Sequence, residues 1–554
     1  MIDSEEIEFN RDDFEGAWEI RESVFINEQG FVEEHDEYDD MEETIHITAR
    51  VNGELAGCGR VVPGGEDEAH PWTIGRFAIK PEFRRQRLGA KLVWEAERIA
   101  WSCGAARVIL HAQCRVAPFY QQLGYKSYGS VDKEEHVAHI WMGKNRPNEE
   151  LVDEEPHQGI FNQKMHDLGA APSAIRELFA YGQKRKAEIG EENVFDFSIG
   201  NPSIPAPPAV AQALRDLADE EPSALHGYTD ARGLASTRQA IADNLNERYG
   251  TAYTPDNFYM TMGAAASLAC TLKALVSTGD EVIVVAPYFP EYKMWIEAAG
   301  ATCVKVLARQ EDFQLDVKAI KEAITEHTRA IILNSPNNPT GTVYQADGLA
   351  RLADVLRAKS EEYGNPIYII SDEPYREIVY GGARVPWIPS IYSDTIVCYS
   401  WSKSLSLPGE RIGYVLVPSN VTNSQRVYYA ISGAGRALGY VCAPALFQRV
   451  IERCVNEPTD VESYDENRRL LRSIMEENGF EYVDPRGAFY LWVKSPDGDA
   501  RAFADCALGK EILMVPSESF GIGGWVRVGY CVSKETIENS REAFKKLKIA
   551  YEAI

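Results

Sequence analysis

Lys403 lies in a run of small hydroxyl residues, Ser-Trp-Ser-Lys-Ser at 400–404, and Arg411 follows eight positions later. A lysine that is partly desolvated and close to another cation has a lowered pKa, so its neutral amine can attack a carbonyl carbon and form a Schiff base. The nearby guanidinium could bind an anion such as a phosphate. This pairing predicts covalent chemistry at Lys403.

Other polar groups could complete such a site. Asp372 could keep a ring nitrogen protonated, and Asn338 and Tyr375 could donate hydrogen bonds to a phenolate oxygen. The small-residue run 262–267, Met-Gly-Ala-Ala-Ala-Ser, leads into an expected helix whose N-terminus suits an anion. Together these groups match the needs of pyridoxal phosphate, namely a Schiff-base lysine and a carboxylate at the pyridinium nitrogen.

The elements that must position these groups form a βαβ pattern. The stretch 346–363 has helical spacing, and short β-rich runs lie at 281–287, 330–336, 367–374 and 395–403. This alternation predicts an α/β fold with a mostly parallel sheet covered by helices. Ligands of such sheets bind beyond the carboxyl ends of the strands, where this sequence places polar segments at 334–341, 371–375 and 400–404.

Composition limits the class of protein. The chain has 554 residues, 45% of them apolar and 25% charged, which predicts two or three ordinary globular domains. A net charge of −27 argues against a general nucleic-acid binder. No run of about 18 uncharged apolar residues predicts a membrane span, and no secretory signal begins the chain. Ten cysteines without a CxxC pair favour reduced thiols, a cytoplasmic location and no structural zinc.

The polar stretch 145–163 divides the chain. It carries two prolines and lacks apolar periodicity, so we expect a linker there. The expected domains are then 1–144 and 164–554. Within the second we expect a large domain over about 205–455 and a small domain built from 164–204 and 456–554.

The N-terminal domain has a second, different pattern. Strands are expected at 45–51, 54–62, 73–79 and 108–112. The third strand runs into a basic loop, and a helix then extends to about Cys103. A basic loop at a helix N-terminus predicts an anion site, because free backbone N–H groups and the helix dipole face the ligand.

Residues 8–143 resemble the GNAT family of acyl-CoA N-acyltransferases, most closely its ElaA-like branch. The matching motifs are Arg84-x-x-x-x-Gly89 after a strand and Phe119-Tyr120-x-x-x-Gly124-Tyr125. Arg87 replaces the usual glycine, and its side chain could crowd a pyrophosphate. The resemblance implies that an amine attacks the thioester directly, that Tyr120 protonates the leaving thiolate, and that acetyl-CoA is bound by Phe77, Ile79, Arg84, Arg85, Gln86, Arg87, Leu88, Gly89 and Ala90.

Two further features of this domain have alternative interpretations. Glu28 is a candidate base, although an acidic residue in such a segment is more often solvated. His136-x-x-His139 could suggest a metal pair, but no third ligand lies nearby in the sequence. We therefore expect a surface or packing role for these histidines, and no metal.

Residues 164–554 resemble the fold type I, class I and II aminotransferases, and the aspartate aminotransferases in particular. Seven motifs occur in the order and spacing of that family: Ser-Ile-Gly-Asn-Pro (198–202), Gly-Tyr-Thr-Asp-Ala-Arg-Gly (227–233), Pro-Tyr-Phe-Pro-Glu-Tyr (287–292), Asn-Asn-Pro-Thr-Gly (337–341), Asp-Glu-Pro-Tyr (372–375), Ser-x-Ser-Lys (400–403) and Arg411. The resemblance implies a seven-stranded, mostly parallel sheet with a small α/β domain, bound pyridoxal phosphate, and a homodimer.

The resemblance also implies residue roles. Lys403 would hold the cofactor and move the substrate Cα proton, Asp372 would hold the pyridinium proton, and Phe289 would stack on the ring. Asn338 and Tyr375 would bind the ring oxygen. The phosphate would be held by Ala264, Ala265, Ser400, Ser402, Arg411 and, from the partner subunit, Tyr228. Arg527 would bind the substrate α-carboxylate in bidentate fashion, with Gly200 and Asn201 at the same end.

The substrate depends on Arg436, which lies 33 residues after Lys403. It could bind a distal carboxylate across the dimer, or it could be structural and bond local carbonyls. The resemblance to the aminotransferases implies glutamate and 2-oxoglutarate as the donor and acceptor pair. We predict a bifunctional aminotransferase and N-acetyltransferase. The alternatives are a non-catalytic acyl-CoA sensor that regulates the transaminase, and a lyase or decarboxylase on the same fold.

Overall fold

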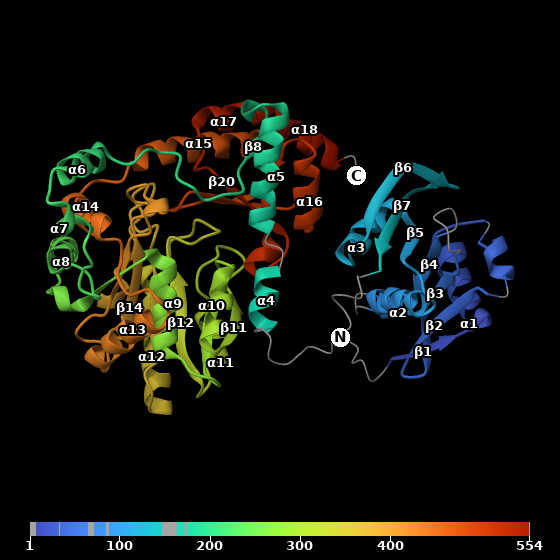
Figure 1. Ribbon diagram of the computed structural model, residues 1–554, viewed down its shortest axis with the longest axis horizontal. Helices are drawn as coiled ribbons and strands as arrows, with labels where there is room; N and C mark the ends of the chain where they lie inside the picture. The colour runs from blue at the N-terminus through green and yellow to red at the C-terminus, as the bar shows by residue number, and fades with distance from the viewer. Residues whose placement is uncertain are drawn as a thin grey trace. The chain divides into compact units, whose positions relative to one another are not determined.

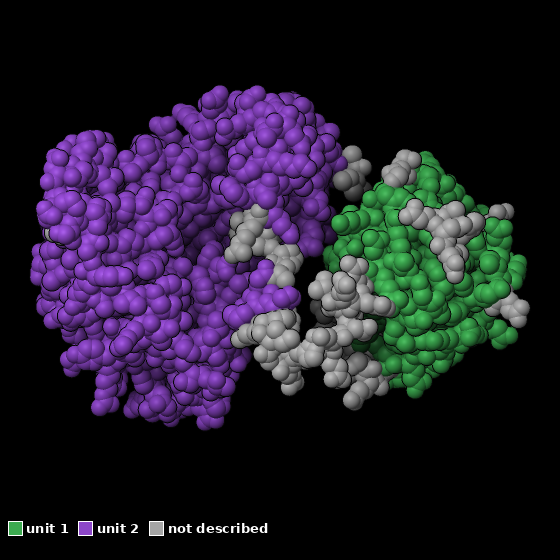
Figure 2. All heavy atoms as spheres, viewed as in Figure 1, with its two compact units in different colours: residues 1–162 green, residues 163–554 purple. Residues whose placement is uncertain are grey.

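The computed structural model describes residues 7–32, 34–41, 43–64, 71–84, 88–146, 163–170 and 174–552. The chain forms two compact units, residues 1–162 and 163–554 (Figure 2). Most of the predicted linker at 145–163 lies outside the described residues. Within the described part of the chain, no helix is long and apolar enough to cross a membrane.

Unit 1 is built on one seven-stranded sheet with helices on both faces (Figure 1). Ala56 of the third strand packs under helix α2 (Leu88–Ser102), whereas its neighbour Leu55 packs under α1 (Phe14–Arg21), because successive side chains of a strand point to opposite faces. In spatial order the strands are β1 (Ile7–Arg11), β2 (Ile45–Val51), β3 (Glu54–Val62), β4 (Trp72–Ile79), β5 (Arg107–Gln113), β7 (Val137–Asn145) and β6 (Lys126–Glu134).

The parallel pair β4 and β5 separates soon after it begins. These strands pair only through Trp72 with Val108 and Thr73 with Ile109. Within β4, Arg76 has a φ of 52°, and the register with β3 shifts nearby, which is the signature of a bulge. The strands therefore diverge toward their carboxyl ends, where α2 and the short helix α3 (Ala117–Gln122) begin on one face.

Unit 2 contains the predicted parallel sheet. Only β15 runs against the other strands, because both its pairings are antiparallel. The predicted helix coincides with α12 (Ala346–Tyr363). In spatial order the strands are β11 (Thr302–Leu307), β10 (Glu281–Ala286), β12 (Thr328–Asn334), β13 (Tyr368–Asp372), β14 (Thr395–Ser400), β15 (Gly413–Leu416) and β9 (Phe258–Thr261). The predicted fold class is thus confirmed.

Helices cover both faces of this sheet, and two of its apolar cores meet at β10. One core joins Val282 and Val284 of β10 to α9 (Gly263–Leu275), α10 (Glu291–Ala299) and α13 (Ser424–Ala437). The other joins Ile283 and Val285 of the same strand to α11 (Val317–Ala323) and α12. A strand that is buried on both faces reads as a continuous apolar run, which is why these strands were recognisable in the sequence.

The remaining layer of unit 2 brings together both ends of its chain. β8 (Phe195–Asp196) pairs in parallel with β18 (Ile512–Leu513). A four-stranded sheet lies beside this pair, in the order β16 (Tyr482–Val483), β17 (Tyr490–Lys494), β20 (Trp525–Gly529) and β19 (Val515–Pro516). Figure 1 shows the accompanying helices gathered at one end of the unit. They are α5 (Ala174–Ile189), α15 (Val461–Glu477), α16 (Ala500–Leu508), α17 (Lys534–Asn539) and α18 (Arg541–Glu552).

Candidate active sites

A cavity of about 280 Å³ opens at the carboxyl edge of the large sheet. The strand ends are level there, because Asn334 of β12 pairs with Asp372 of β13, and Asp372 pairs with Cys398 of β14. Most of the predicted cofactor and substrate residues of unit 2 line this one cavity: Gly200, Ala264, Ala265, Phe289, Asn338, Asp372, Tyr375, Ser400, Ser402, Lys403, Arg411 and Arg527.

Lys403 follows β14 and is partly buried. Its Nζ donates a hydrogen bond to the carbonyl oxygen of Gly200 at 2.5 Å and lies 5.5 Å from the centre of the Phe489 ring. Burial, reinforced by the positive charges of Arg527 and Arg411, lowers the pKa of Lys403 to about 8. About a tenth of this lysine is therefore a neutral amine at pH 7, far more than for an ordinary lysine, as a nucleophile or proton acceptor requires.

Asp372 is a buried carboxylate with one oxygen in use. The Tyr292 hydroxyl donates a hydrogen bond to Oδ2, while Oδ1 is buried and has no partner among the described residues. Burial raises the pKa of Asp372 to about 7. An unpartnered buried carboxylate oxygen is costly unless a cationic or N–H donor reaches it, so Asp372 suits a protonated ring nitrogen.

Tyr292 was not predicted from the sequence as a site residue. It lies three residues after Phe289, at the start of α10, and both residues line the cavity. Tyr292 ends the same Pro-Tyr-Phe-Pro-Glu-Tyr motif that contains Phe289, and this was the signal that could have found it.

Another group of residues that line this cavity is suited to hold an anion. Gly263 begins α9 with a φ of +84°, and a Cβ atom there would lie 3.2 Å from the Arg411 guanidinium. The cation thus lies against the helix N-terminus, beside Ser400 and Ser402, whose hydroxyls are 3.1 Å apart. Free N–H groups, hydroxyls and a guanidinium are the donors that proteins use for phosphate.

Arg527 of β20 is buried at the third side of the cavity. Its Nη1 donates to Asn338 Oδ1 at 3.0 Å and its Nη2 to the Ser198 carbonyl oxygen at 2.5 Å. Its Nε is buried without a partner among the described residues, and the guanidinium lies 4.5 Å from the Tyr490 ring centre. A planar donor with spare capacity suits a carboxylate.

Tyr490 was not predicted from the sequence. Its hydroxyl lies 2.9 Å from the Tyr375 hydroxyl and beside Gly200, where a Cβ atom would come within 2.0 Å of it. This close approach gives Gly200 a steric role, because no side chain could be accommodated at that position.

Three predicted residues lie outside the cavity lining. Asn201 is exposed, and so are Tyr228 and Arg436. Arg436 lies in the last turn of α13, and its guanidinium makes no hydrogen bond or ion pair with any residue in the described part of the chain. The bonding of local carbonyls, which was the structural alternative for Arg436, is therefore not seen. The roles expected of Tyr228 and Arg436 across a dimer stay predictions.

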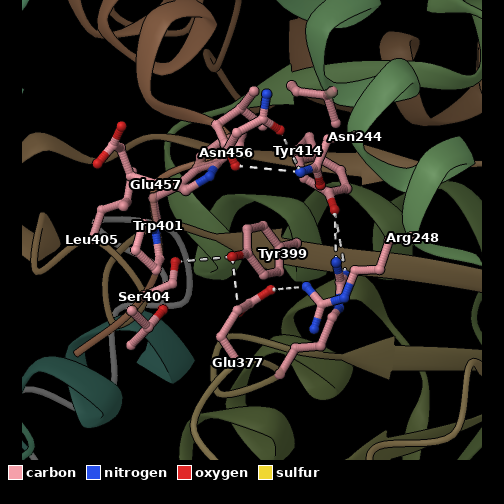
Figure 3. A pocket seen from close by; sticks show the side chains of 15 residues that line it. Asn244, Arg248, Glu377, Tyr399, Trp401, Ser404, Leu405, Tyr414, Asn456 and Glu457 are labelled. Carbon is pink, nitrogen blue, oxygen red and sulfur yellow. Dashed lines mark hydrogen bonds and ion pairs between the residues drawn. The ribbon is translucent and has the colours of Figure 1, made fainter. Parts of the chain in front are cut away.

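The residues around a second cavity, of about 210 Å³, make hydrogen bonds that hold the segment 399–404, which contains Lys403 (Figure 3). The Tyr399 hydroxyl lies between Glu377 and Ser404, at 3.0 Å and 2.9 Å from their side-chain oxygens. Arg248 donates to the same Glu377 at 2.9 Å. This polar network helps to fix the segment, and it was not predicted because Arg248 and Glu377 are 129 positions apart in sequence.

Unit 1 has a cavity of about 590 Å³ where β4 and β5 diverge. Of the predicted residues, Arg85, Gln86 and Arg87 lie outside the described part of the chain. Tyr120 is buried in the cavity wall, and burial raises its pKa, which keeps its hydroxyl protonated and able to donate. The others that line the cavity are Phe77, Ile79, Arg84, Leu88, Gly89 and Ala90.

Glu28 forms an ion pair with Arg84. Two guanidinium nitrogens donate to the two carboxylate oxygens at 2.7 Å and 2.5 Å, and Arg84 Nε donates to the Ile79 carbonyl oxygen at 2.9 Å. The hydrogen bond from Arg84 lowers the pKa of Glu28. Glu28 is thus an exposed side chain that is paired with Arg84, and its role as a base stays a prediction.

The two candidate metal histidines do not converge. His136 Nε2 bonds the Gln29 carbonyl oxygen at 3.1 Å, whereas His139 Nδ1 bonds the Val137 carbonyl oxygen at 3.1 Å. Among the described residues, no group of three or more histidine, cysteine, aspartate or glutamate side chains could hold a metal ion.

Comparisons with known proteins agree with both halves of this description. The model of the family "Aminotransferase class I and II" matches residues 192–544, and that of the "Acetyltransferase (GNAT) family" matches residues 9–125. The aspartate aminotransferase of Thermotoga maritima is 30% identical over 380 residues, which is 68% of this chain and 96% of that protein.

Two solved structures extend the comparison. The crystal structure of an amino transferase from Eubacterium rectale is 53% identical, with a TM-score of 0.69, and covers 71% of this chain and 99% of that chain. The aspartate aminotransferase of Thermus thermophilus with maleate is 26% identical, with a TM-score of 0.62, over 70% of this chain and 99% of that chain.

Proposed function

The chain belongs to the class I and II aminotransferases and carries a GNAT domain in unit 1, and on that basis we propose that it is a bifunctional enzyme. Unit 2 would use pyridoxal phosphate to transfer an amino group between a dicarboxylic amino acid, aspartate or glutamate, and a 2-oxo acid. Unit 1 would transfer an acetyl group from acetyl-CoA to an amine. The observation that carries the first proposal is the unpartnered Asp372 oxygen in the cavity that also holds Lys403.

The cavity of unit 2 offers a group for each part of the cofactor. Bound there, pyridoxal phosphate would supply an electron sink for the electron pair that a proton leaves on the substrate Cα. Asp372 would keep the ring nitrogen protonated, and Phe289 would cover the ring. The α9 N-terminus, Ser400, Ser402 and Arg411 would bind the phosphate, and Asn338 and Tyr375 the ring oxygen.

Substrate handling falls to the chain's own acid and base groups. Arg527 would bind the α-carboxylate through its fork and so orient the Cα–H bond. Lys403, with a pKa of about 8, would take the proton from the substrate Cα and would later return a proton to complete the transfer of the amino group. Apolar walls such as the buried Leu268 and the partly buried Trp295 would exclude water from the exchange.

The dicarboxylate class rests on two lines of support. Relatives such as that of Thermotoga maritima are named aspartate aminotransferases, and the Thermus thermophilus structure contains maleate, a dicarboxylate. Arg436 is an exposed guanidinium without a partner among the described residues, which suits a cation supplied to the partner subunit. We therefore propose a homodimer in which Tyr228 and Arg436 complete the neighbouring site.

The acetyltransferase proposal rests on the cavity between β4 and β5. The first turn of α2, at Leu88–Ala90, lines it, and its N–H groups, which have no partner within the helix, would donate to the pyrophosphate of acetyl-CoA. A neutral amine would attack the thioester carbonyl, and Tyr120 would donate a proton to the departing thiolate. The non-catalytic sensor remains the alternative, because it needs the same binding groups.

Two assays on the full chain test these activities. The first incubates protein and pyridoxal phosphate with single amino acids and 2-oxo acids and identifies the products by chromatography. New amino acids are expected, and carbon dioxide or ammonia instead would favour the decarboxylase or lyase. The second measures thiol release from acetyl-CoA with a panel of amines. Binding of acetyl-CoA without thiol release would favour the sensor.

A further inference from the structure

Four ionisable side chains gather on one face of the unit 1 sheet. On β5, Leu110 and Ala112 point into the core under α2, so His111 and Gln113 point to the other face. His139 of β7 lies directly opposite Gln113, and Asp132 of β6 lies opposite His139. Glu134, two residues after Asp132, shares this face, which is the one that α2 and Tyr120 do not occupy.

The two histidines are held against each other and against carboxylates. Their ring centres are 4.8 Å apart, and Trp141 stacks on His111 at 4.5 Å. His111 Nε2 lies 2.7 Å from Asp132 Oδ1. Glu134 Oε2 faces both rings, 3.6 Å from His139 Nε2 and 3.7 Å from His111 Nδ1.

This cluster opens into the cavity that contains Tyr120. His111, His139, Glu134, Arg76 and Glu34 all line it, together with Tyr120. The cluster and the tyrosine approach the gap between β4 and β5 from opposite faces of the sheet. A group held in that gap would therefore have a hydroxyl donor on one side and imidazoles on the other.

The protonation states differ between the two rings. The Val137 carbonyl can only accept, so His139 Nδ1 carries the hydrogen, and the neutral ring presents a lone pair at Nε2. His139 is only 4% exposed, and burial lowers its pKa. For His111 burial opposes protonation, but the bonds with Glu134 and Asp132 outweigh it and raise the pKa.

The Glu134 carboxylate, which faces both rings, stays charged at neutral pH. The hydrogen bond with His111 lowers the pKa of Glu134 to about 2. Arg76 of β4 lies 3.4 Å from Glu134, and Glu34 lies 3.5 Å from Arg76, so the charges that face His139 are Glu134, Asp132, Arg76 and, beyond it, Glu34. An ammonium ion that enters this end of the cavity meets an anion beside a neutral imidazole.

We propose that unit 1 binds its acceptor as a primary ammonium ion at this cluster, that Glu134 attracts it, and that His139 Nε2 removes its proton. The proposal rests on the proposed acetyltransferase function and names the base for it. Glu134, which faces both rings, links His139 to His111, and His111 relays the proton toward Asp132, which is half exposed.

The chemistry balances in protons and electrons. His139 takes one proton from R–NH₃⁺, and the nitrogen lone pair then forms the C–N bond as the C–S bond breaks. Tyr120 gives its proton to the thiolate of CoA and regains the second proton of the amine. The net products are the acetamide, CoA as a free thiol, and one proton, which leaves through His111 and Asp132.

The test measures thiol release from acetyl-CoA by the full chain, with L-glutamate, L-lysine, spermidine or tyramine as the probe amine. Assays run from about pH 6 to about pH 10, which spans the titration of imidazole and of amines. In the wild type, kcat/KM should rise with pH through the His139 titration and then level off. In His139→Gln it should fall about 100-fold or more near pH 7, the usual scale for a general base.

The pH dependence separates catalysis from structure. The difference in kcat/KM between His139→Gln and the wild type should become smaller as the pH approaches the pKa of the probe amine, because a neutral amine needs no base. Calorimetry should show unchanged acetyl-CoA affinity. His136→Gln is the matched control, since it removes a histidine that lies three residues away outside the cavity lining, and it should leave kcat/KM within about twofold.

A second variant guards against a folding defect in the first. Glu134→Gln removes the anion that stabilises protonated His139, so the acidic limb of the profile should move to lower pH. Three results would overturn the inference but not the proposed acetyltransferase function. They are a loss of kcat/KM in His139→Gln that does not change with pH, an equal loss in His136→Gln, and an acidic limb in Glu134→Gln that stays at the wild-type pH. If the wild type releases no thiol with any probe amine, the proposed function fails, and the inference fails with it.

Discussion

Tyr292 donates its hydroxyl hydrogen bond to Oδ2 of Asp372 and leaves Oδ1 of the same carboxylate unpartnered among the described residues. The two oxygens of one buried carboxylate are thus divided between a structural donor and the cavity. The hydrogen bond from Tyr292 opposes the upward shift that burial imposes on the pKa of Asp372. Tyr292 therefore helps to keep the carboxylate charged, which is the state that a protonated ring nitrogen needs.

Tyr292→Phe should slow transamination about tenfold without abolishing it, since a hydrogen bond to a charged group contributes about 1.5 kcal/mol or more. Loss of the donor raises the Asp372 pKa further, so the acidic limb of the kcat profile should move to higher pH. Tyr288→Phe is the control, because Tyr288 stacks on Tyr292 but does not contact Asp372. An equal effect of both variants would mean that packing, not the hydrogen bond, matters.

Asp372→Asn should retain cofactor but lose most of the transamination rate, because a neutral amide does not stabilise a protonated pyridine. In the cofactor-free protein, by contrast, Asp372→Asn should increase the free energy of unfolding. The folded-state pKa of about 7 lies above the unfolded value, so the wild type loses stability as the pH rises toward and through about 7. Thermal unfolding should therefore show a larger gain from the substitution at pH 8 than at pH 5.5. A pH-independent difference in Tm would contradict the buried-charge account.

Arg436→Ala tests the substrate class. If Arg436 binds the distal carboxylate, its loss should cost about 2–5 kcal/mol in kcat/KM for aspartate, the usual scale for unpairing a buried charge, and far less for alanine. The measurement is the ratio of kcat/KM for aspartate over alanine in mutant and wild type. Arg527→Ala is the internal control and should harm both substrates alike. An unchanged ratio in Arg436→Ala would direct the search to neutral or aromatic amino acids.

Subunit mixing tests the proposed homodimer. Tyr228→Phe and Lys403→Ala should each have low activity alone, the first through weaker cofactor binding. A hybrid dimer regains one intact site, made from Lys403 of one chain and Tyr228 of the other. Mixing equal amounts under exchange conditions should restore about a quarter of wild-type activity, since half of the dimers are hybrids with one working site. No restoration in verified hybrids would place Tyr228 in its own chain's site.

The sequence predicts the large sheet well because its strands are buried on both faces and read as local apolar runs. Lys403, Asp372 and Arg411 were found for a related reason: each follows or lies near a strand end in a short, recognisable segment. Tyr490 was missed because its hydroxyl meets that of Tyr375, which is 115 positions away in the sequence. Arg436 differs, because its position in the sequence suggested that it binds a substrate carboxylate in the partner subunit, and the structure of a single chain cannot contain that contact.

Unit 1 illustrates the same limit. The motif around Arg84 and Gly89 predicts a ligand site, but not that Glu28 pairs with Arg84 across 56 residues. The spacing of His136 and His139 suggests a pair, yet the ring that contacts His139 is that of His111 on another strand. Which side chains meet depends on strand register, and register is set by long-range packing rather than by local pattern.

Borohydride reduction of the cofactor-loaded protein tests the central claim most directly. Reduction makes a carbonyl cofactor's attachment to a lysine permanent, and peptide mass spectrometry then locates it. A pyridoxyl phosphate adduct is expected on the peptide that contains Lys403 and should be absent from Lys403→Ala, which should also lose transamination while it keeps its fold by circular dichroism. An adduct on a different lysine, or near-wild-type transamination by Lys403→Ala, would contradict the assignment of this cavity as the active site.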